Sequence, residues 1–156
     1  MTVGPDTAQE WRRKSWLAEA GPGDQILVVT LRRWLEGPDG QQAVWIGLSG
    51  EIGELSAETL LQALEDFLYA LSHGLNRQLT RHSAYCPCLG EDEMLLADVV
   101  RAAGRGDHDT AAARAAEVVR SCELAPILEH AARLGILLDE IPFETSSTQP
   151  GQRRLH

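Results

Sequence analysis

The sequence has few lysines, no long apolar run and no stretch that resembles a secretory signal. Lysine occurs once against thirteen arginines, and no apolar run approaches the ~20 residues that a membrane span needs. The residues after Met1 are polar and charged, so the start of the chain does not resemble a secretory signal. We therefore expect a soluble, cytoplasmic protein without membrane association. The bias towards arginine and alanine indicates a GC-rich, bacterial genome.

Positive charge is also scarce. The 23 acidic side chains outnumber the 14 basic ones and leave a formal net charge of −9. Because the phosphates of nucleic acids must be neutralised by Lys and Arg, this balance argues against a nucleic-acid partner. We interpret the short basic runs at 12–14 and at Arg32 and Arg33 as solvated helix faces.

The motifs of common enzymes are missing. The sequence has no phosphate-binding glycine loop, nucleophile elbow or metalloprotease motif. Its glutamates at 51, 54, 58 and 65 do not form the two Glu-x-x-His motifs of a di-iron bundle. The sequence therefore favours a protein that is not an enzyme, while a catalytic site assembled from scattered acids and histidines stays open.

Helical periodicity dominates what is present. The clearest helix is predicted from Ser56, as its N-cap, to His82, with apolar residues at steps of three and four. A second helix should begin near Gly90 and stop at Gly104 and Gly106, with acidic residues in its first turn. Asp107 can then cap a helix over 108–123, and Pro126 interrupts the pattern before a last helix over 126–141. A kinked pair and two short helices both fit the region around this proline.

The first third of the chain allows two interpretations. Residues 25–50 fit two helices joined by a Gly-Pro-Asp-Gly turn, but "ILVVT" and "AVWIG" would also suit a β-hairpin. We favour helices, because "LRRWLE" has no alternation of period two. A short helix is also predicted within 7–20. Together these elements predict one all-α domain over 1–142, a bundle of five to six helices with short connections, followed by a disordered polar tail over 143–156.

Cysteine is scarce too. Three residues cannot all pair within one chain, and in a cytosolic setting they stay reduced. Two of them form a Cys-Pro-Cys pattern at 86–88, in which both thiolates can reach one soft metal ion. The helix predicted from Ser56 ends at His82, close to this pair, and would direct the His82 side chain inward. The candidate ligands for Zn²⁺ or another thiophilic transition metal are Cys86, Cys88, His82, Cys122 and His130.

Two other interpretations of these residues stand beside metal binding. Free cysteine often serves only as a small buried hydrophobe, and Cys122 lies among alanines and valines on the expected inner side of its helix. A lone inward histidine such as His130 is often a hydrogen-bonded core residue. In a redox role, the start of the next helix would favour thiolate at Cys88, but the acidic residues at 91–93 oppose this effect.

The four tryptophans all lie in the first 45 residues. Trp11 and Trp16 are five apart and do not share one helix face well, and an exposed tryptophan beside arginines is typical of an interface anchor.

The sequence leaves two functional hypotheses. The first is a small accessory or regulatory protein that binds a transition metal or senses redox state through the Cys-Pro-Cys loop. The alternative is an all-helical adaptor that binds another protein through the Trp11/Trp16 region and uses its cysteines only for packing.

Overall fold

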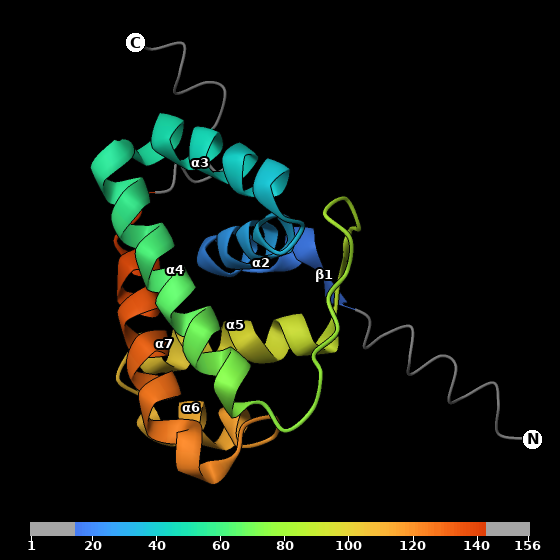
Figure 1. Cartoon of the computed structure of the whole chain (residues 1–156), viewed down its shortest axis with the longest axis vertical. Helices are drawn as coiled ribbons and strands as arrows, with labels where there is room; N and C mark the ends of the chain where they lie inside the picture. Colours follow the sequence, from blue (N-terminus) through green and yellow to red (C-terminus); the bar gives the residue numbers. More distant parts are fainter. Residues whose placement is uncertain (1–14, 143–156) are drawn as a thin grey trace, which may run out of the picture.

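Helices make up most of the computed structural model, which describes residues 15–142 (Figure 1). Within this range the α-helices are α2 (Pro22–Trp34), α3 (Pro38–Ile52), α4 (Glu54–Gly74), α5 (Glu91–Gly104), α6 (His108–Ala115) and α7 (Leu124–Asp139). Two 3-10 turns, η1 (Leu17–Glu19) and η2 (Ser121–Glu123), accompany them. Strands β1 (Ser15–Trp16) and β2 (Cys88–Leu89) form one short antiparallel pair. The predicted all-α bundle is confirmed.

The region 25–50 forms the two helices α2 and α3 rather than a β-hairpin. Each begins with a proline, at a position where the missing N–H has no intrahelical partner in any case. Gly37 connects them with a φ of 111°, in the region that favours glycine. The helical interpretation of this region is confirmed.

The leucine-rich helix α4 is shorter than predicted at its far end. Gly53 rather than Ser56 is its N-cap, and the helix ends at Gly74 instead of continuing to His82. Backbone contacts across the chain end it: Asn76 N donates to the Val118 carbonyl at 2.8 Å, and Arg120 N donates to the Gly74 carbonyl at 2.8 Å. Residues 75–87 therefore form an irregular segment.

The predicted helix over 108–123 is also too long. Asp107 caps α6, as predicted, by accepting a hydrogen bond from Thr110 N. The helix ends at Ala115, however, because the following residues turn to pair with the end of α4. Pro126 lies in the first turn of α7, where its missing N–H interrupts no helical hydrogen bond. The chain around it thus forms two separate helices.

The N-terminal helix predicted within 7–20 is wrong for the residues that the structure describes. Residues 15–19 form β1 and η1 instead, and Trp16 pairs with Cys88 in the antiparallel register. The rest of that prediction, together with Trp11 and the predicted tail over 143–156, lies outside the described residues. No helix among residues 15–142 is long and apolar enough to cross a membrane.

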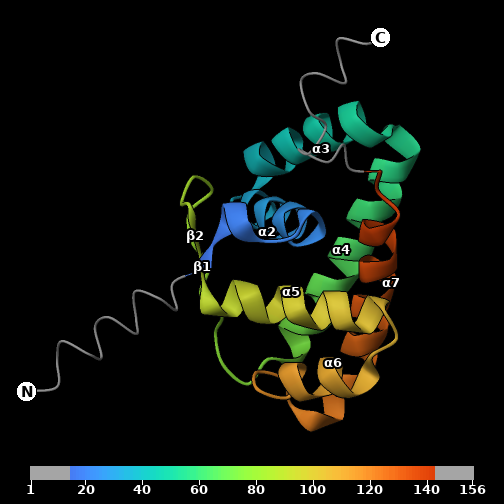
Figure 2. The ribbon, with the colours of Figure 1, turned by 180° about the vertical axis from the view of Figure 1, so that it is seen from behind.

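The core lies where α4, α5 and α7 meet (Figures 1 and 2). Helix α5 approaches α7 closely at two glycines. A Cβ added to Gly135 would lie 2.3 Å from the Val100 carbonyl oxygen, and one added to Gly104 would lie 2.8 Å from the Gly135 backbone. The most completely buried side chains of the core include Leu64, Phe67, Val99, Val100, Ile127 and Leu134.

Candidate functional site

The Cys-Pro-Cys segment runs in an extended conformation between two sets of hydrogen bonds. On one side, Arg32 donates from Nη1 to the Cys86 carbonyl at 2.8 Å and from Nη2 to the Cys88 carbonyl at 2.6 Å. On the other side, the Pro87 carbonyl accepts from Leu17 N at 2.8 Å. This alternation is that of a β-strand, in which residues two apart share a face. Accordingly both cysteines are half-buried and Pro87 is exposed.

Arg32 is the residue that organises this segment, and its predicted place on a solvated helix face is wrong. Its side chain is 0% exposed, because it lies one turn after buried Val28 on the inward side of α2. The guanidinium binds both carboxylate oxygens of Glu93, with Nε–Oε2 and Nη2–Oε1 distances of 2.7 Å. Arg32 thereby joins α2, α5 and the Cys-Pro-Cys segment.

Glu93 completes a junction at the first turn of α5. Its carboxylate also accepts from Gly90 N at 2.9 Å, as in a capping box, and from His82 N at 3.2 Å. Burial by itself would raise the pKa of Glu93, but the hydrogen bonds from Arg32 and from these two backbone N–H groups outweigh it and lower the pKa. The carboxylate is therefore held in its charged form.

Asp92 ties the irregular segment to the same helix turn. It accepts from Arg77 at 2.7 and 3.0 Å, and from the backbone N and the hydroxyl of Thr80 at 2.8 and 3.0 Å. The Arg77 hydrogen bonds, assisted by Thr80, hold the pKa of Asp92 well below its usual range. Of the acidic run at 91–93 only Glu91 is exposed. The run thus fastens residues 75–87 to α5.

His82 lies in this fastened segment with its ring beside Cys86. The distance from His82 Nδ1 to Cys86 Sγ is 3.3 Å. The ring packs over Gly90, where an added Cβ would lie 2.9 Å from Nε2. Glycine at that position therefore leaves room for the imidazole, and the structure brings together one nitrogen and one sulfur donor.

The other predicted ligands do not join this pair. Cys122 is exposed in η2 and not on the inner side of a helix, because α6 ends before it. Figures 1 and 2 place its segment at the end of the molecule formed by α6 and the start of α7, away from β2. His130 is half-buried on α7. Within residues 15–142, no three His, Cys, Asp or Glu side chains are grouped so as to hold a metal ion.

Arg32 is the site residue that sequence reasoning missed. Two signals pointed to it: its position one turn after Val28 on the apolar side of the helix, and an acid three residues after Gly90, as in a capping box. Neither signal reveals that the two side chains meet, because they are 61 residues apart in the sequence.

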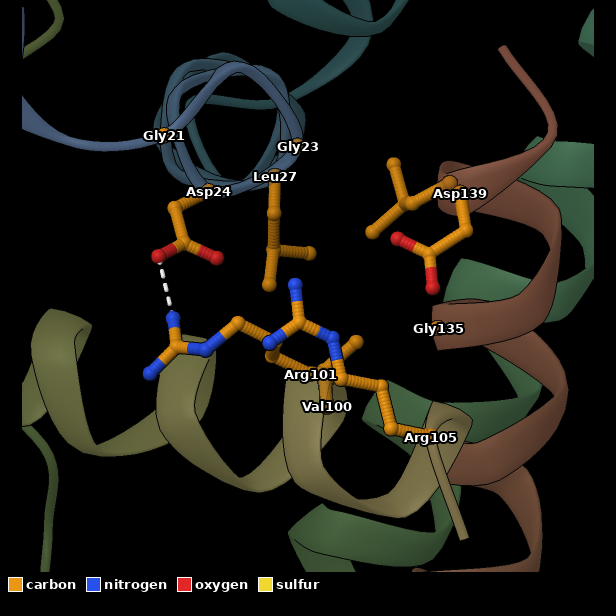
Figure 3. Close-up of a pocket in the computed structure, with 10 residues that line it drawn as sticks. Gly21, Gly23, Asp24, Leu27, Val100, Arg101, Arg105, Gly135 and Asp139 are labelled. Atoms are coloured by element: carbon orange, nitrogen blue, oxygen red, sulfur yellow. Dashed lines mark hydrogen bonds and ion pairs between the residues drawn. The ribbon is translucent and has the colours of Figure 1, made fainter.

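A hollow of about 80 Å³ lies between the start of α2 and helices α5 and α7 (Figure 3). Arg101 and Arg105 reach into it from α5, and Arg101 is hydrogen-bonded to Asp24. Burial raises the pKa of Asp24 despite this arginine. Since Asp24 and Asp139 balance the two arginines, the hollow has no excess charge to attract an ion. It serves as a polar junction between helices.

Comparisons with models of protein families, with curated proteins and with solved structures found no match for this chain. A functional conclusion therefore depends on the geometry around the Cys-Pro-Cys segment.

Proposed function

We propose that this is a small accessory or regulatory protein that binds a thiophilic transition metal ion, such as Zn²⁺, through His82, Cys86 and Cys88. The observation that carries the proposal is the 3.3 Å separation of His82 Nδ1 and Cys86 Sγ. A tetrahedral zinc ion at ~2.0 Å from nitrogen and ~2.3 Å from sulfur separates these two donors by about 3.5 Å. The first two ligands thus already stand at nearly the required spacing.

The extended backbone supports Cys88 as the third ligand. The carbonyls of Cys86 and Cys88 both accept from Arg32, as those of residues two apart in an extended segment can, so we expect their thiols on the same side of the chain. Cys88 has to rotate its side chain to reach an ion held by the other two, since these three are not grouped as they stand. The fixed backbone lowers the cost of ordering the ligands, because Arg32 already holds both cysteine carbonyls.

The same backbone favours metal binding over a redox role for the pair. Two residues of extended chain span about 6.6 Å, near the upper limit of Cα separations in disulfides. The Cβ atoms of a disulfide lie only about 3.5–4.5 Å apart, so joining Cys86 to Cys88 would bend the segment away from its hydrogen bonds with Arg32. A bound ion instead needs only side-chain movement.

Cobalt titration of protein purified without chelator tests the proposal, because thiolate–Co²⁺ charge-transfer absorption reports sulfur ligation directly. We expect wild-type protein to bind one equivalent. Cys86→Ser/Cys88→Ser should weaken cobalt binding by more than about 100-fold. Substituting a residue that only hydrogen-bonds a metal ligand already lowers metal affinity about 10–100-fold, and this variant removes two ligands. The matched control is Cys122→Ser, which should bind like wild type. A wild-type titration no tighter than that of the double variant would refute the metal site.

The second candidate is a helical adaptor without metal, and two exposed aromatic residues favour it. Tyr85, 84% exposed, directly precedes Cys86, and Trp16, 39% exposed, pairs with Cys88. The guanidinium of Arg33 lies 5.3 Å from the centre of the Tyr85 ring. Tyr, Trp and Arg are the residues most often found as interface anchors. An adaptor of this kind would show no saturable thiolate absorption in the cobalt titration.

A further inference from the structure

Helix α3 presents an apolar surface that the described part of the chain leaves uncovered. It lies at one end of the molecule across α2 and is joined to the start of α4 (Figures 1 and 2). Its outer face carries Ala43, Ile46, Gly47 and Gly50, all exposed, and Ile46 is 61% exposed. From Gly40 to Gly50 the sequence has no charged residue, although the chain as a whole carries a net charge of −9. This stretch therefore adds no charge repulsion between two copies of this acidic protein.

Beside this face a groove of about 340 Å³ runs between α2 and α3. Ile26 and Val29 form its α2 wall, and Ala43, Gly47 and Leu48 form its α3 wall. The two helices are antiparallel neighbours, so Arg33 lies at the end near their connection and Glu51 lies at the opposite end. The groove is thus apolar along its length and oppositely charged at its two ends.

Packing within the chain requires glycine at only some of the glycine positions of α3. Gly40 is required, because a Cβ there would lie 2.0 Å from the Arg33 carbonyl oxygen. Gly47 and Gly50 have no atom within 4 Å of an added Cβ, so any residue would fit. Glycine weakens a helix at such positions, and one benefit it offers in return is close approach by another backbone.

We infer that α3 and the α2–α3 groove form the interface of a two-fold symmetric homodimer, in which α3 of each copy lies antiparallel against the other. With a two-fold axis near Gly47, the grooves of the two copies run in opposite directions. Glu51 of one copy then meets Arg33 of the second copy, and the same pair forms again on the other side. Ile46 of each copy enters the hollow over Gly47 of the other. This charge pattern complements itself, which favours a second copy over an unrelated protein as the occupant.

Sedimentation equilibrium over an about hundredfold range of concentration tests the inference. We expect a species of twice the 17.1 kDa chain mass that dissociates on dilution. Gly47→Gln should raise the dissociation constant at least about tenfold while leaving the thermal midpoint of the dilute monomer unchanged or higher, because glutamine is the better helix former. Ile46→Ser should also dissociate the dimer, whereas Ile136→Ser, at another exposed isoleucine on α7, should not. Wild-type protein that is monomeric throughout the range overturns the inference, as does a Gly47→Gln variant that still dimerises.

Charge reversal tests the antiparallel arrangement. Arg33→Glu should weaken the dimer, because it places two acids together, and adding Glu51→Arg in the same chain should restore it. Failure of the double variant to recover overturns the arrangement. Cross-linking within one chain between α3 and residues 1–14 or 143–156 would instead assign the groove to the ends of the chain. The outcome is independent of the proposed metal site, since none of the substituted residues is one of its ligands.

Discussion

At the scale of single residues, the guanidinium of Arg32 lies where α2, the first turn of α5 and the Cys-Pro-Cys segment meet. It donates four hydrogen bonds to three residues, and its planar fork matches the two oxygens of Glu93. Within the described residues, every buried side-chain nitrogen or oxygen has a hydrogen-bond partner. The hydrogen bonds around this buried ion pair offset part of the cost of removing its charges from water.

Arg32→Lys is expected to lower the free energy of unfolding by more than about 2 kcal/mol. One ammonium group cannot reach Glu93 and both cysteine carbonyls together, and each lost bond to a charged group is worth about 1.5–3 kcal/mol. Chemical denaturation of both variants measures the effect. The control substitution Arg133→Lys, at an exposed arginine on α7, should change the free energy by less than about 0.5 kcal/mol. Equal effects at the two positions would contradict the role assigned to Arg32.

At the scale of secondary-structure elements, the first turn of α5 connects the irregular segment to the bundle. Asp92 binds Arg77 and Thr80, while Glu93 binds Arg32 and the backbone of His82 and Gly90. A single helix turn therefore fixes residues 75–90, a long connection with little regular structure, to the bundle. The short separation of His82 from Cys86 depends on this turn.

The carboxylates of Asp92 and Glu93 in this turn should make the free energy of unfolding depend on pH in acid. Both carboxyls titrate near pH 4 in an unfolded chain, but their pKa values are lower in the folded protein. As the pH falls, the unfolded state takes up protons first, so their contribution is complete above about pH 5 and declines from about pH 4 downward.

Urea denaturation at a series of pH values between about 6 and 3 measures this decline. Asp92→Asn should be less stable than wild type near neutral pH, yet lose less free energy of unfolding on acidification. Asp109→Asn, exposed on α6, should follow the wild-type curve. If the free energy of unfolding of Asp92→Asn falls with pH in parallel with that of wild type, the Asp92 carboxylate is not responsible for the loss of stability in acid.

At the scale of the whole molecule, α5 and α7 make the closest helix contact of the bundle, and α3 lies at one end of it. The glycines at 104 and 135 let two backbones meet, so their side of the fold is densely packed. Helix α3 packs chiefly on α2 and α4 and keeps an apolar outer face. The proposed dimer would cover this face.

Gly135→Ala should destabilise the protein by about 1–3 kcal/mol, because the new methyl group would overlap the Val100 carbonyl and push α5 from α7. Thermal unfolding of the purified variant measures this loss. Gly23→Ala on α2 is the control, since an added Cβ there meets nothing within 4 Å. That change should leave the thermal midpoint unchanged or raise it. A stable Gly135→Ala variant would mean that the two helices separate at little cost.

The sequence by itself determined the helical class, because the spacing of Leu60, Leu64 and Phe67, the Asp107 cap and the prolines that begin α2 and α3 act within a few residues of chain. It also singled out five candidate ligands, namely His82, Cys86, Cys88, Cys122 and His130. Only the tertiary structure decided where α4 ends, since residues 118–120 bind the chain there. It alone paired Arg32 with Glu93 across 61 residues and exposed Cys122. These features depend on contacts between distant segments, which local periodicity does not encode.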